Sequence, residues 1–167
     1  MVPAEVQAAQ AAAAAESGVS VVTCPIANLY LQGRSRPVAT PRGLTALHAL
    51  RAAGVTLAGG GDNIQDCFVP VGNGDPLRVA QYLVVAGQLA PSVACELVTT
   101  GARAVMGLEA IAVEPGAPAD LVAVRAGSLG EAVAGATPER LVFRRGELVV
   151  RTRIEAEGEG VLQAATP

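Results

Sequence analysis

One stretch of the chain combines residue types that could do chemistry, and it begins with three consecutive glycines. Residues 59–61 are glycine, Asp62 and Asn63 follow at once, and Phe68 comes soon after. Because glycine has no Cβ, such a run lets the backbone turn sharply and approach a ligand closely. A carboxylate there can bind a metal ion or take up a proton. On spacing alone, a turn in which Asp62 or Asn63 caps backbone amides explains the pattern at least as well.

A second stretch of interest covers residues 24–34, which end in Arg34. It follows an apolar strand, as the glycine run does, so we expect the two stretches to lie side by side. An arginine in this position could clamp an anion or a carboxylate. The alternative is a loop that its own hydrogen bonds hold in place.

Other catalytic sets are excluded by the residue inventory. The only histidine, His48, lies inside a predicted helix, where we expect a structural or surface role. A hydrolytic zinc site uses about three protein ligands, and a serine protease triad needs a histidine beside its nucleophile. Three widely spaced cysteines (Cys24, Cys67 and Cys95) argue against a disulfide scaffold or a zinc ribbon, and we expect them to be reduced core residues.

Composition excludes several classes of protein. The net charge is −3 and aromatic residues make up only 2% of the 167 residues, which argues against a nucleic-acid binder. No run of 18 apolar residues occurs, so no membrane span is expected, and the N-terminus lacks the basic region of a secretory signal. These features predict a cytoplasmic protein that binds neither nucleic acid nor membrane.

The elements that must position these residues follow a repeated pattern. A helix, a glycine and a short apolar strand occur twice, which is typical of a parallel sheet with helical crossovers. Asp66 and Asp75 are predicted to be helix caps or salt-bridge partners. The predicted segments are a helix over 2–17, a strand over 19–23, a long loop over 25–41, a helix over 44–53, a strand over 55–58, and helices over 75–90 and 91–106.

The composition changes after Gly107. A strand is predicted over 121–124, and strands over 141–144 and 147–151 flank Arg145-Gly146 as a hairpin. We therefore expect one region over 1–106, a second over 107–153 and a flexible acidic tail over 154–167. Two parallel strands alone leave both sheet edges open, so we expect the chain to be the C-terminal piece of a larger fold or to need a partner chain.

Two sequence series identify a resemblance to a known family. They read V-V-T-C-P-x-x-N-L-x-L-Q-G-R and A-G-V-T-L-A-G-G-G-D-N-I-Q-D-C-F-V-P-V-G, and a later one reads P-G-A-P-A-D-L-V-A-V. The first two resemble the C-terminal part of cytosine deaminases of the amidohydrolase superfamily. The third resembles the stretch with which many amidohydrolases enter their small β-sandwich.

The resemblance implies a fold, a reaction and a set of site residues. The fold would be the C-terminal portion of a (β/α)8 barrel plus part of a small β-sandwich, with 19–23 and 55–58 as the last two barrel strands. Asp62 would bind a catalytic divalent metal, iron or zinc, and accept a proton from the metal-activated water. Asn63 and Phe68 would contact a small heterocyclic substrate. Water would replace the amino group of cytosine or a related cyclic amidine, and ammonia would leave.

The chain also departs from the family pattern. The metal-binding histidines of the family would lie before Met1, so we expect this chain alone to be inactive. Asn63 stands where some members carry a second aspartate, which points to other cyclic amidines as well. For assembly, the sequence leaves open a homo-oligomer or a complementing N-terminal segment. The alternative function is a non-catalytic or complementing α/β module that binds a partner chain.

Overall fold

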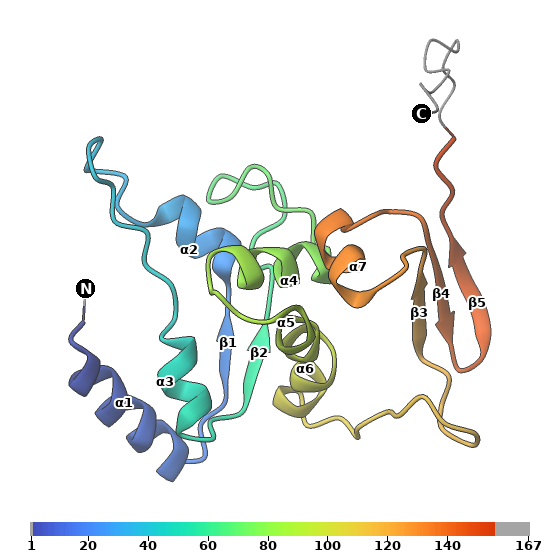
Figure 1. The fold of residues 1–167 in the computed structure, drawn as a ribbon, viewed down its shortest axis with the longest axis horizontal. Helices are drawn as coiled ribbons and strands as arrows, with labels where there is room; N and C mark the ends of the chain where they lie inside the picture. Colours follow the sequence, from blue (N-terminus) through green and yellow to red (C-terminus); the bar gives the residue numbers. More distant parts are fainter. Residues whose placement is uncertain (1, 156–167) are drawn as a thin grey trace, which may run out of the picture. The chain divides into compact units, whose positions relative to one another are not determined.

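The computed structural model describes residues 2–155 and shows a mixed α/β chain, which confirms the predicted α/β class (Figure 1). The chain divides into two compact units. Unit one holds Met1–Ala117 and Ala126–Ala136, and unit two holds Pro118–Arg125 and Thr137–Pro167. No helix within residues 2–155 combines the length and the apolar character needed to cross a bilayer.

Unit one is organised around two short parallel strands, β1 (Val21–Thr23) and β2 (Leu57–Gly59). Thr23 pairs with Gly59 in the register, and its fully buried hydroxyl donates to Thr45 Oγ1 at 2.9 Å, so the buried polar group has a partner. Because the strands run parallel, their carboxyl ends lie at the same edge of the sheet.

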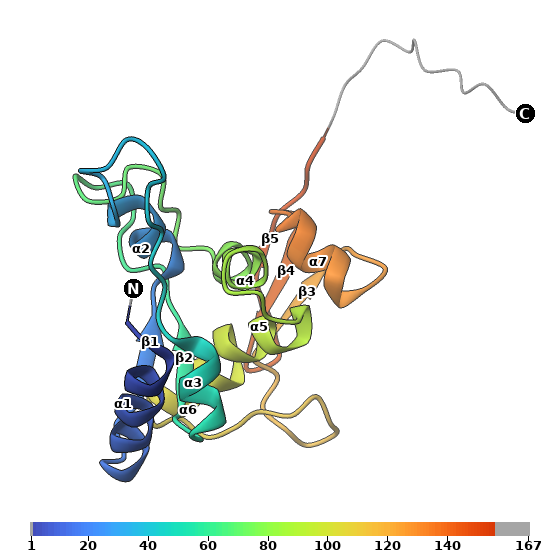
Figure 2. The same ribbon diagram turned by 60° about the vertical axis from the view of Figure 1, so that its left-hand side comes forward.

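Seven helices of unit one are described. They are α1 (Ala4–Glu16), α2 (Pro25–Leu31), α3 (Leu47–Ala52), α4 (Pro76–Val85), α5 (Pro91–Val98), α6 (Thr100–Val105) and α7 (Leu129–Gly135). Figures 1 and 2 both show α1 beside α3, while α4, α5 and α6 pack against β2. Side chains of Val69, Val79 and Leu83 are fully buried at the centre of this core. Helices α4, α5 and α6 therefore cover β2, and residues of α4 and α5 form the core with it.

Close approach of helix and strand explains one of the glycines. A Cβ on Gly59 would lie 2.9 Å from Leu83 Cδ1 and 3.0 Å from Val98 Cγ1. Glycine therefore allows α4 and α5 to pack tightly against the end of β2. The first residue of the glycine run, Gly59, is therefore needed for packing, and the loop begins after it.

Two helix predictions need correction. The predicted loop over 25–41 contains α2, because Pro25 occupies the first helical position, where a missing N–H is no loss, and Ile26 and Ala27 are buried. The single helix predicted over 91–106 is two helices, α5 and α6, because Thr99 leaves the helical region with φ −124° and ψ −92°. The short helix α7 was not predicted.

Unit two is a three-stranded antiparallel sheet in the order β3 (Leu121–Val124), β4 (Arg140–Arg144) and β5 (Glu147–Arg151). The predicted strand and hairpin are confirmed. Arg145 and Gly146 form the turn with φ of 52° and 84°. Of the predicted acidic tail over 154–167, residues 156–167 lie outside the described part of the chain.

Candidate active site

The carboxyl ends of β1 and β2 bring Cys24 and Asp62 to one edge of the sheet. Gly60 N donates to Thr23 O at 2.8 Å, and a Cβ on Gly60 would lie 3.7 Å from Cys24 Sγ. Burial raises the pKa of the Cys24 thiol, and the negative charge of Asp62 raises it further. The two loops therefore meet where ligands bind in parallel α/β folds.

Asp62 occupies an uncommon backbone conformation. Its φ is 61°, in the left-handed region that non-glycine residues seldom adopt, although aspartate tolerates it better than most. The residue is exposed at the end of the glycine run. Its carboxylate is thus presented to solvent directly beyond β2, as the sequence predicts.

Asp66 organises the loop that follows. Its Oδ2 accepts a hydrogen bond from Asn63 Nδ2 at 2.6 Å, and its Oδ1 accepts from the backbone N–H of Phe68 and of Val69, both at 2.9 Å. These bonds, that of Val69 foremost and that of Asn63 second, lower the pKa of Asp66 below its ordinary value. Asn63 and Phe68, two residues predicted to bind substrate, therefore share one carboxylate as their neighbour.

The loop folds back on itself at two glycines. A Cβ on Gly72 would overlap the backbone oxygen of Asn63, and a Cβ on Gly74 would lie 3.0 Å from Ile64 Cδ1. Val69 is fully buried and anchors the middle of the loop, whereas the Phe68 side chain is 58% exposed. The backbone of Phe68, the residue predicted to contact substrate, is thus held in place, and its ring is exposed at the surface.

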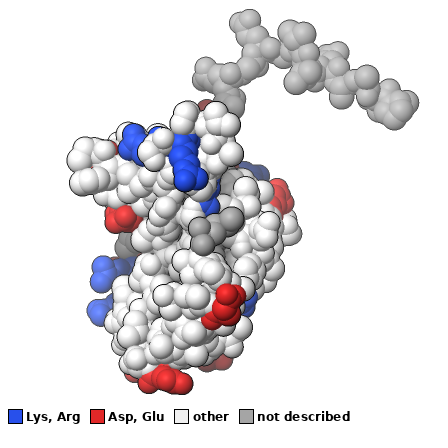
Figure 3. All heavy atoms as spheres, turned by 90° about the vertical axis from the view of Figure 1, so that its left-hand side faces the viewer, with Lys and Arg blue, Asp and Glu red and all other residues white. Residues whose placement is uncertain are grey.

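The loop after β1 is held by arginines. Arg42 Nη1 donates to the carbonyl oxygens of Leu29 and Gln32, each at 3.0 Å, at the end of α2. The Arg34 guanidinium carbon lies 4.8 Å from the centre of the Tyr30 ring. A hollow of about 330 Å³ lies among these side chains. Blue arginines gather at the top of the face in Figure 3, where this segment lies.

Sequence reasoning missed the roles of Asp66 and Arg42. Asp66 was predicted as a helix cap or salt-bridge partner, and it caps the amides of a turn instead. Its signal was available, because aspartate often bonds the backbone N–H two residues on. Asp75 does cap a helix, since its Oδ1 accepts from Leu77 N at 3.0 Å at the start of α4. Arg42 carries no comparable local signal.

Of the remaining candidate residues, His48 and Cys95 lie on helices α3 and α5, and Cys67 lies in the loop after β2, between Asp66 and Phe68. His48 is exposed on α3, in agreement with a surface role. Cys95 is half-buried in α5, and burial raises its pKa. Cys67 is exposed, so the expectation that all three cysteines are core residues is wrong for this one.

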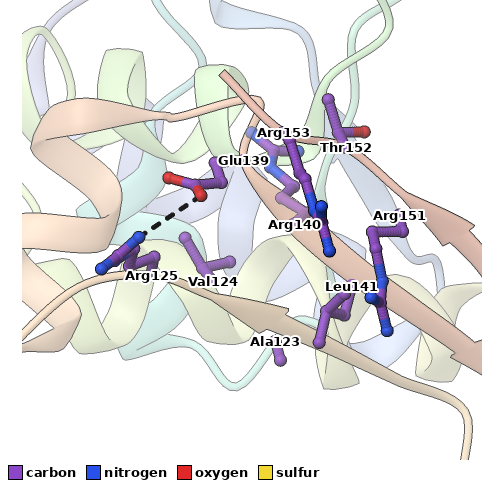
Figure 4. A pocket seen from close by; sticks show the side chains of 9 residues that line it. All are labelled: Ala123, Val124, Arg125, Glu139, Arg140, Leu141, Arg151, Thr152 and Arg153. Carbon is purple, nitrogen blue, oxygen red and sulfur yellow. Dashed lines mark ion pairs between the residues drawn. The ribbon is translucent and has the colours of Figure 1, made fainter. Parts of the chain in front are cut away.

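A second hollow lies within unit two, with a volume of about 410 Å³. Figure 4 shows its lining, in which Arg125 forms an ion pair with Glu139 at 3.5 Å, and Arg151 lies at the opposite end. The Arg125 side chain is 82% exposed, so this pair contributes little to stability.

The metal-binding capacity of the described residues is limited. Within residues 2–155, no group of three or more His, Cys, Asp or Glu side chains gathers in a way that could hold a metal ion. Asp62 fits one oxygen ligand of such a site, while the described donor set does not make a complete one. The predicted metal role of Asp62 therefore depends on ligands from outside these residues.

Comparisons of the sequence with known proteins agree on one family. A sequence model of the amidohydrolase family matches residues 1–151. A pterin deaminase of Rhizobium rhizogenes is 37% identical over 143 residues, which are 83% of this chain and 32% of the relative. A 5-methylthioadenosine/S-adenosylhomocysteine deaminase of Halobacterium salinarum is 38% identical over 120 residues, 66% of this chain and 24% of the relative. The chain thus spans a third or less of the length of these relatives.

Solved structures show the same similarity. An N-isopropylammelide isopropylaminohydrolase from Burkholderia multivorans superposes with a TM-score of 0.72 at 36% identity, over 90% of this chain and 36% of that one. A 5-methylcytosine deaminase from Klebsiella pneumoniae, liganded with 5-fluorocytosine, superposes with a TM-score of 0.71 at 26% identity, over 86% of this chain and 36% of that one.

Proposed function

The chain belongs to the amidohydrolase family, and we propose that it forms one side of the active site of a hydrolytic deaminase. In this proposal, unit one supplies the last two βα units of a barrel and unit two part of a β-sandwich. The observation that carries it is the position of Asp62, exposed directly after β2 and beside the carboxyl end of β1. Barrel enzymes place their catalytic groups at this edge.

The substrate class follows from the names of the similar proteins. Pterin, 5-methylcytosine and N-isopropylammelide are six-membered nitrogen heterocycles or contain one, and each carries an amino or alkylamino group on a ring carbon. Hydrolysis would break that C–N bond, form a carbonyl at the ring carbon and release ammonia or an amine. We therefore propose a planar heterocycle with an amidine carbon as substrate, with pterin and cytosine as the first compounds to test.

Three residues of this chain would have distinct tasks. Asp62 would be one ligand of a divalent metal, iron or zinc, and would accept a proton from the attacking water. Such a metal, when bound, lowers the pKa of water so that hydroxide is available near neutral pH. Phe68, with its exposed ring, would stack on the heterocycle, and Asn63 would hydrogen-bond to its edge.

A hybrid enzyme tests this function. Residues 1–151 would replace the matching segment of the Rhizobium rhizogenes pterin deaminase, which supplies the remaining part of that enzyme. We expect the hybrid to deaminate a heterocycle, and Asp62→Asn to lower kcat about 10²–10⁴-fold.

The matched control is Glu16→Gln, which removes the same charge at the exposed end of α1. It should change kcat less than about twofold, as a distant surface substitution does. Full activity of the Asp62→Asn hybrid would contradict the proposal, because the carboxylate would then be dispensable.

A further inference from the structure

Asp66 stands out because one exposed carboxylate contacts both residues assigned to the substrate. Its two oxygens accept three hydrogen bonds, from Asn63 Nδ2 and from the amides of Phe68 and Val69. The residue lies four positions after Asp62, in the same loop. Its contacts are therefore with the residues that would touch a ligand.

The chemistry of the contact fixes the orientation of the Asn63 amide. An ionised carboxylate can only accept hydrogen bonds, so the amide atom that faces Asp66 must be Nδ2. An aspartate with its ordinary pKa is ionised at neutral pH, and the three bonds lower the pKa of Asp66 further. Asn63 Oδ1 then faces away from Asp66, and within residues 2–155 no group donates to it.

The same carboxylate fixes the backbone that carries Phe68. Asp66 Oδ1 bonds the amide of Phe68 and also that of Val69, whose side chain is fully buried in the core. The exposed ring of Phe68 is thus tied to a buried anchor one residue away. Without Asp66, both amides would need other partners, and the backbone that carries the ring would be held less firmly.

We propose that Asp66 is the positioning residue of this site, which holds Asn63 as a hydrogen-bond acceptor beside the exposed ring of Phe68. This inference rests on the proposed function and names the ligand chemistry more closely. A ligand that fits must be flat, to stack on Phe68, and must present an N–H group at its edge, to bond Asn63 Oδ1.

Hydrogen exchange in the 167-residue chain tests the positioning role without any activity. We expect Asp66→Ala to speed exchange at the amides of Phe68 and Val69 about tenfold. Asp66→Asn should preserve most of the protection, because an amide oxygen can still accept both bonds. Unchanged exchange in Asp66→Ala would overturn the inference.

The matched control is Asp120→Ala in unit two. Asp120 Oδ1 accepts a hydrogen bond from Arg145 N at 2.7 Å, so this substitution breaks the same kind of bond elsewhere. It should speed exchange at Arg145 and leave Phe68 and Val69 unchanged. Equal effects of the two alanine variants at Phe68 would also overturn the inference, because they would indicate general loosening.

The hybrid enzyme tests the acceptor role of Asn63. In Asp66→Asn, the amide at position 66 turns its NH₂ group toward Asn63, whose own amide must rotate and use its oxygen for that contact. With pterin as the probe, we expect KM to rise about tenfold, the loss of one hydrogen bond, while kcat changes less than about twofold.

An exchange of the two side chains provides the rescue. In the double variant Asn63→Asp with Asp66→Asn, the carboxylate at position 63 accepts from the amide at position 66 and keeps a second oxygen free. KM should return to within about threefold of the starting hybrid. An unchanged KM in the single variant overturns the acceptor role. A hybrid that is inactive with its native residues contradicts the proposed function. The hydrogen-exchange measurements on the 167-residue chain then still decide the positioning role.

Discussion

The two loops that follow β1 and β2 leave the same edge of the sheet but are held by opposite charges. Arg42 donates to the carbonyl oxygens of Leu29 and Gln32 in the first loop, whereas Asp66 accepts from the amides of Phe68 and Val69 in the second. A helix that ends leaves carbonyls without partners, and a tight turn leaves amides without partners. The charge of the residue that holds each loop therefore follows from the backbone groups it must satisfy.

This difference also gives the two loops different parts in the proposed function. Between residues 17 and 61 the sequence contains four arginines and no acidic residue, while Asp62 and Asp66 follow immediately. Only the second loop has carboxylates that can bind a metal ion or a proton. The first loop contributes the half-buried Cys24 and a basic surface that includes Arg34, Arg36 and Arg42. The proposed chemistry thus falls to one of two neighbouring loops.

The largest effects on stability should come from the glycines at which each loop closes. A Cβ on Gly33 would overlap the backbone oxygen of Pro41, and one on Gly72 would overlap that of Asn63. We expect alanine at either position to lower the free energy of unfolding by about 1–3 kcal/mol, measured by urea denaturation.

Gly33→Ala should have the larger effect, because Gly33 also has φ of +68°. Gly135→Ala is the control, since nothing lies within 4 Å of its Cβ position. If all three variants unfold alike, the loops are not closed by these contacts.

A smaller effect is expected from Arg42. Replacing it with alanine removes two hydrogen bonds to the end of α2, which should lower the free energy of unfolding by about 1 kcal/mol. Arg36→Ala removes the same charge from the same hollow. Thermal unfolding should show a change below about 0.5 kcal/mol for this control. Equal losses in both variants would mean that the charge, and not the hydrogen bonds, supports the loop.

The proximity of the two loops can be tested through the thiols. Burial and then the charge of Asp62 raise the pKa of Cys24, while burial alone raises that of Cys95. We expect Asp62→Asn to speed alkylation of Cys24 at pH 8 about twofold and to leave Cys95 unchanged. The exposed Cys67 should react fastest of the three. If the alkylation rate of Cys24 does not change, Asp62 does not act on the thiol, and the two strand ends do not bring these residues together.

The smallest effect is a pH dependence confined to the second loop. Asp66 has a lowered pKa in the folded chain, so its hydrogen bonds stabilise the loop above the ordinary pKa of about 3.9. That contribution is lost as the pH falls below this value and through the folded pKa. Amide chemical shifts of Phe68 and Val69 should therefore change below about pH 4. The amides of residues 25–46, a segment with no acidic side chain, should not follow this transition.

Much of this arrangement could be predicted from the sequence. The β-branched run before Cys24, the apolar run before the glycines and the hairpin around Arg145 all carry local signals that agree with the structure. Asp62 is a candidate site residue because it follows the end of a strand, whereas the substrate roles of Asn63 and Phe68 are implied by the family resemblance, and all three roles remain predictions.

The rest depends on contacts that short-range patterns do not contain. Pro25 reads equally well as a loop residue or a first helical residue, and the burial of Ile26 and Ala27 favours the helix. For α7, the signal was present but weak, since Ser128 Oγ accepts from Glu131 N at 3.1 Å as in a capping box, in a segment with two glycines. Arg42 reaches back 13 residues to Leu29, a distance at which a sequence gives no indication.

The central claim is that Asp62 belongs to the metal site of a deaminase, and anomalous X-ray scattering from crystals of the hybrid enzyme grown with zinc tests it most directly. The account predicts an anomalous peak with an Asp62 carboxylate oxygen about 2.0–2.2 Å away, the usual Zn–O distance. A metal bound by the remainder of the enzyme, with Asp62 turned away from it and Asn63 and Phe68 facing solvent, would contradict the account.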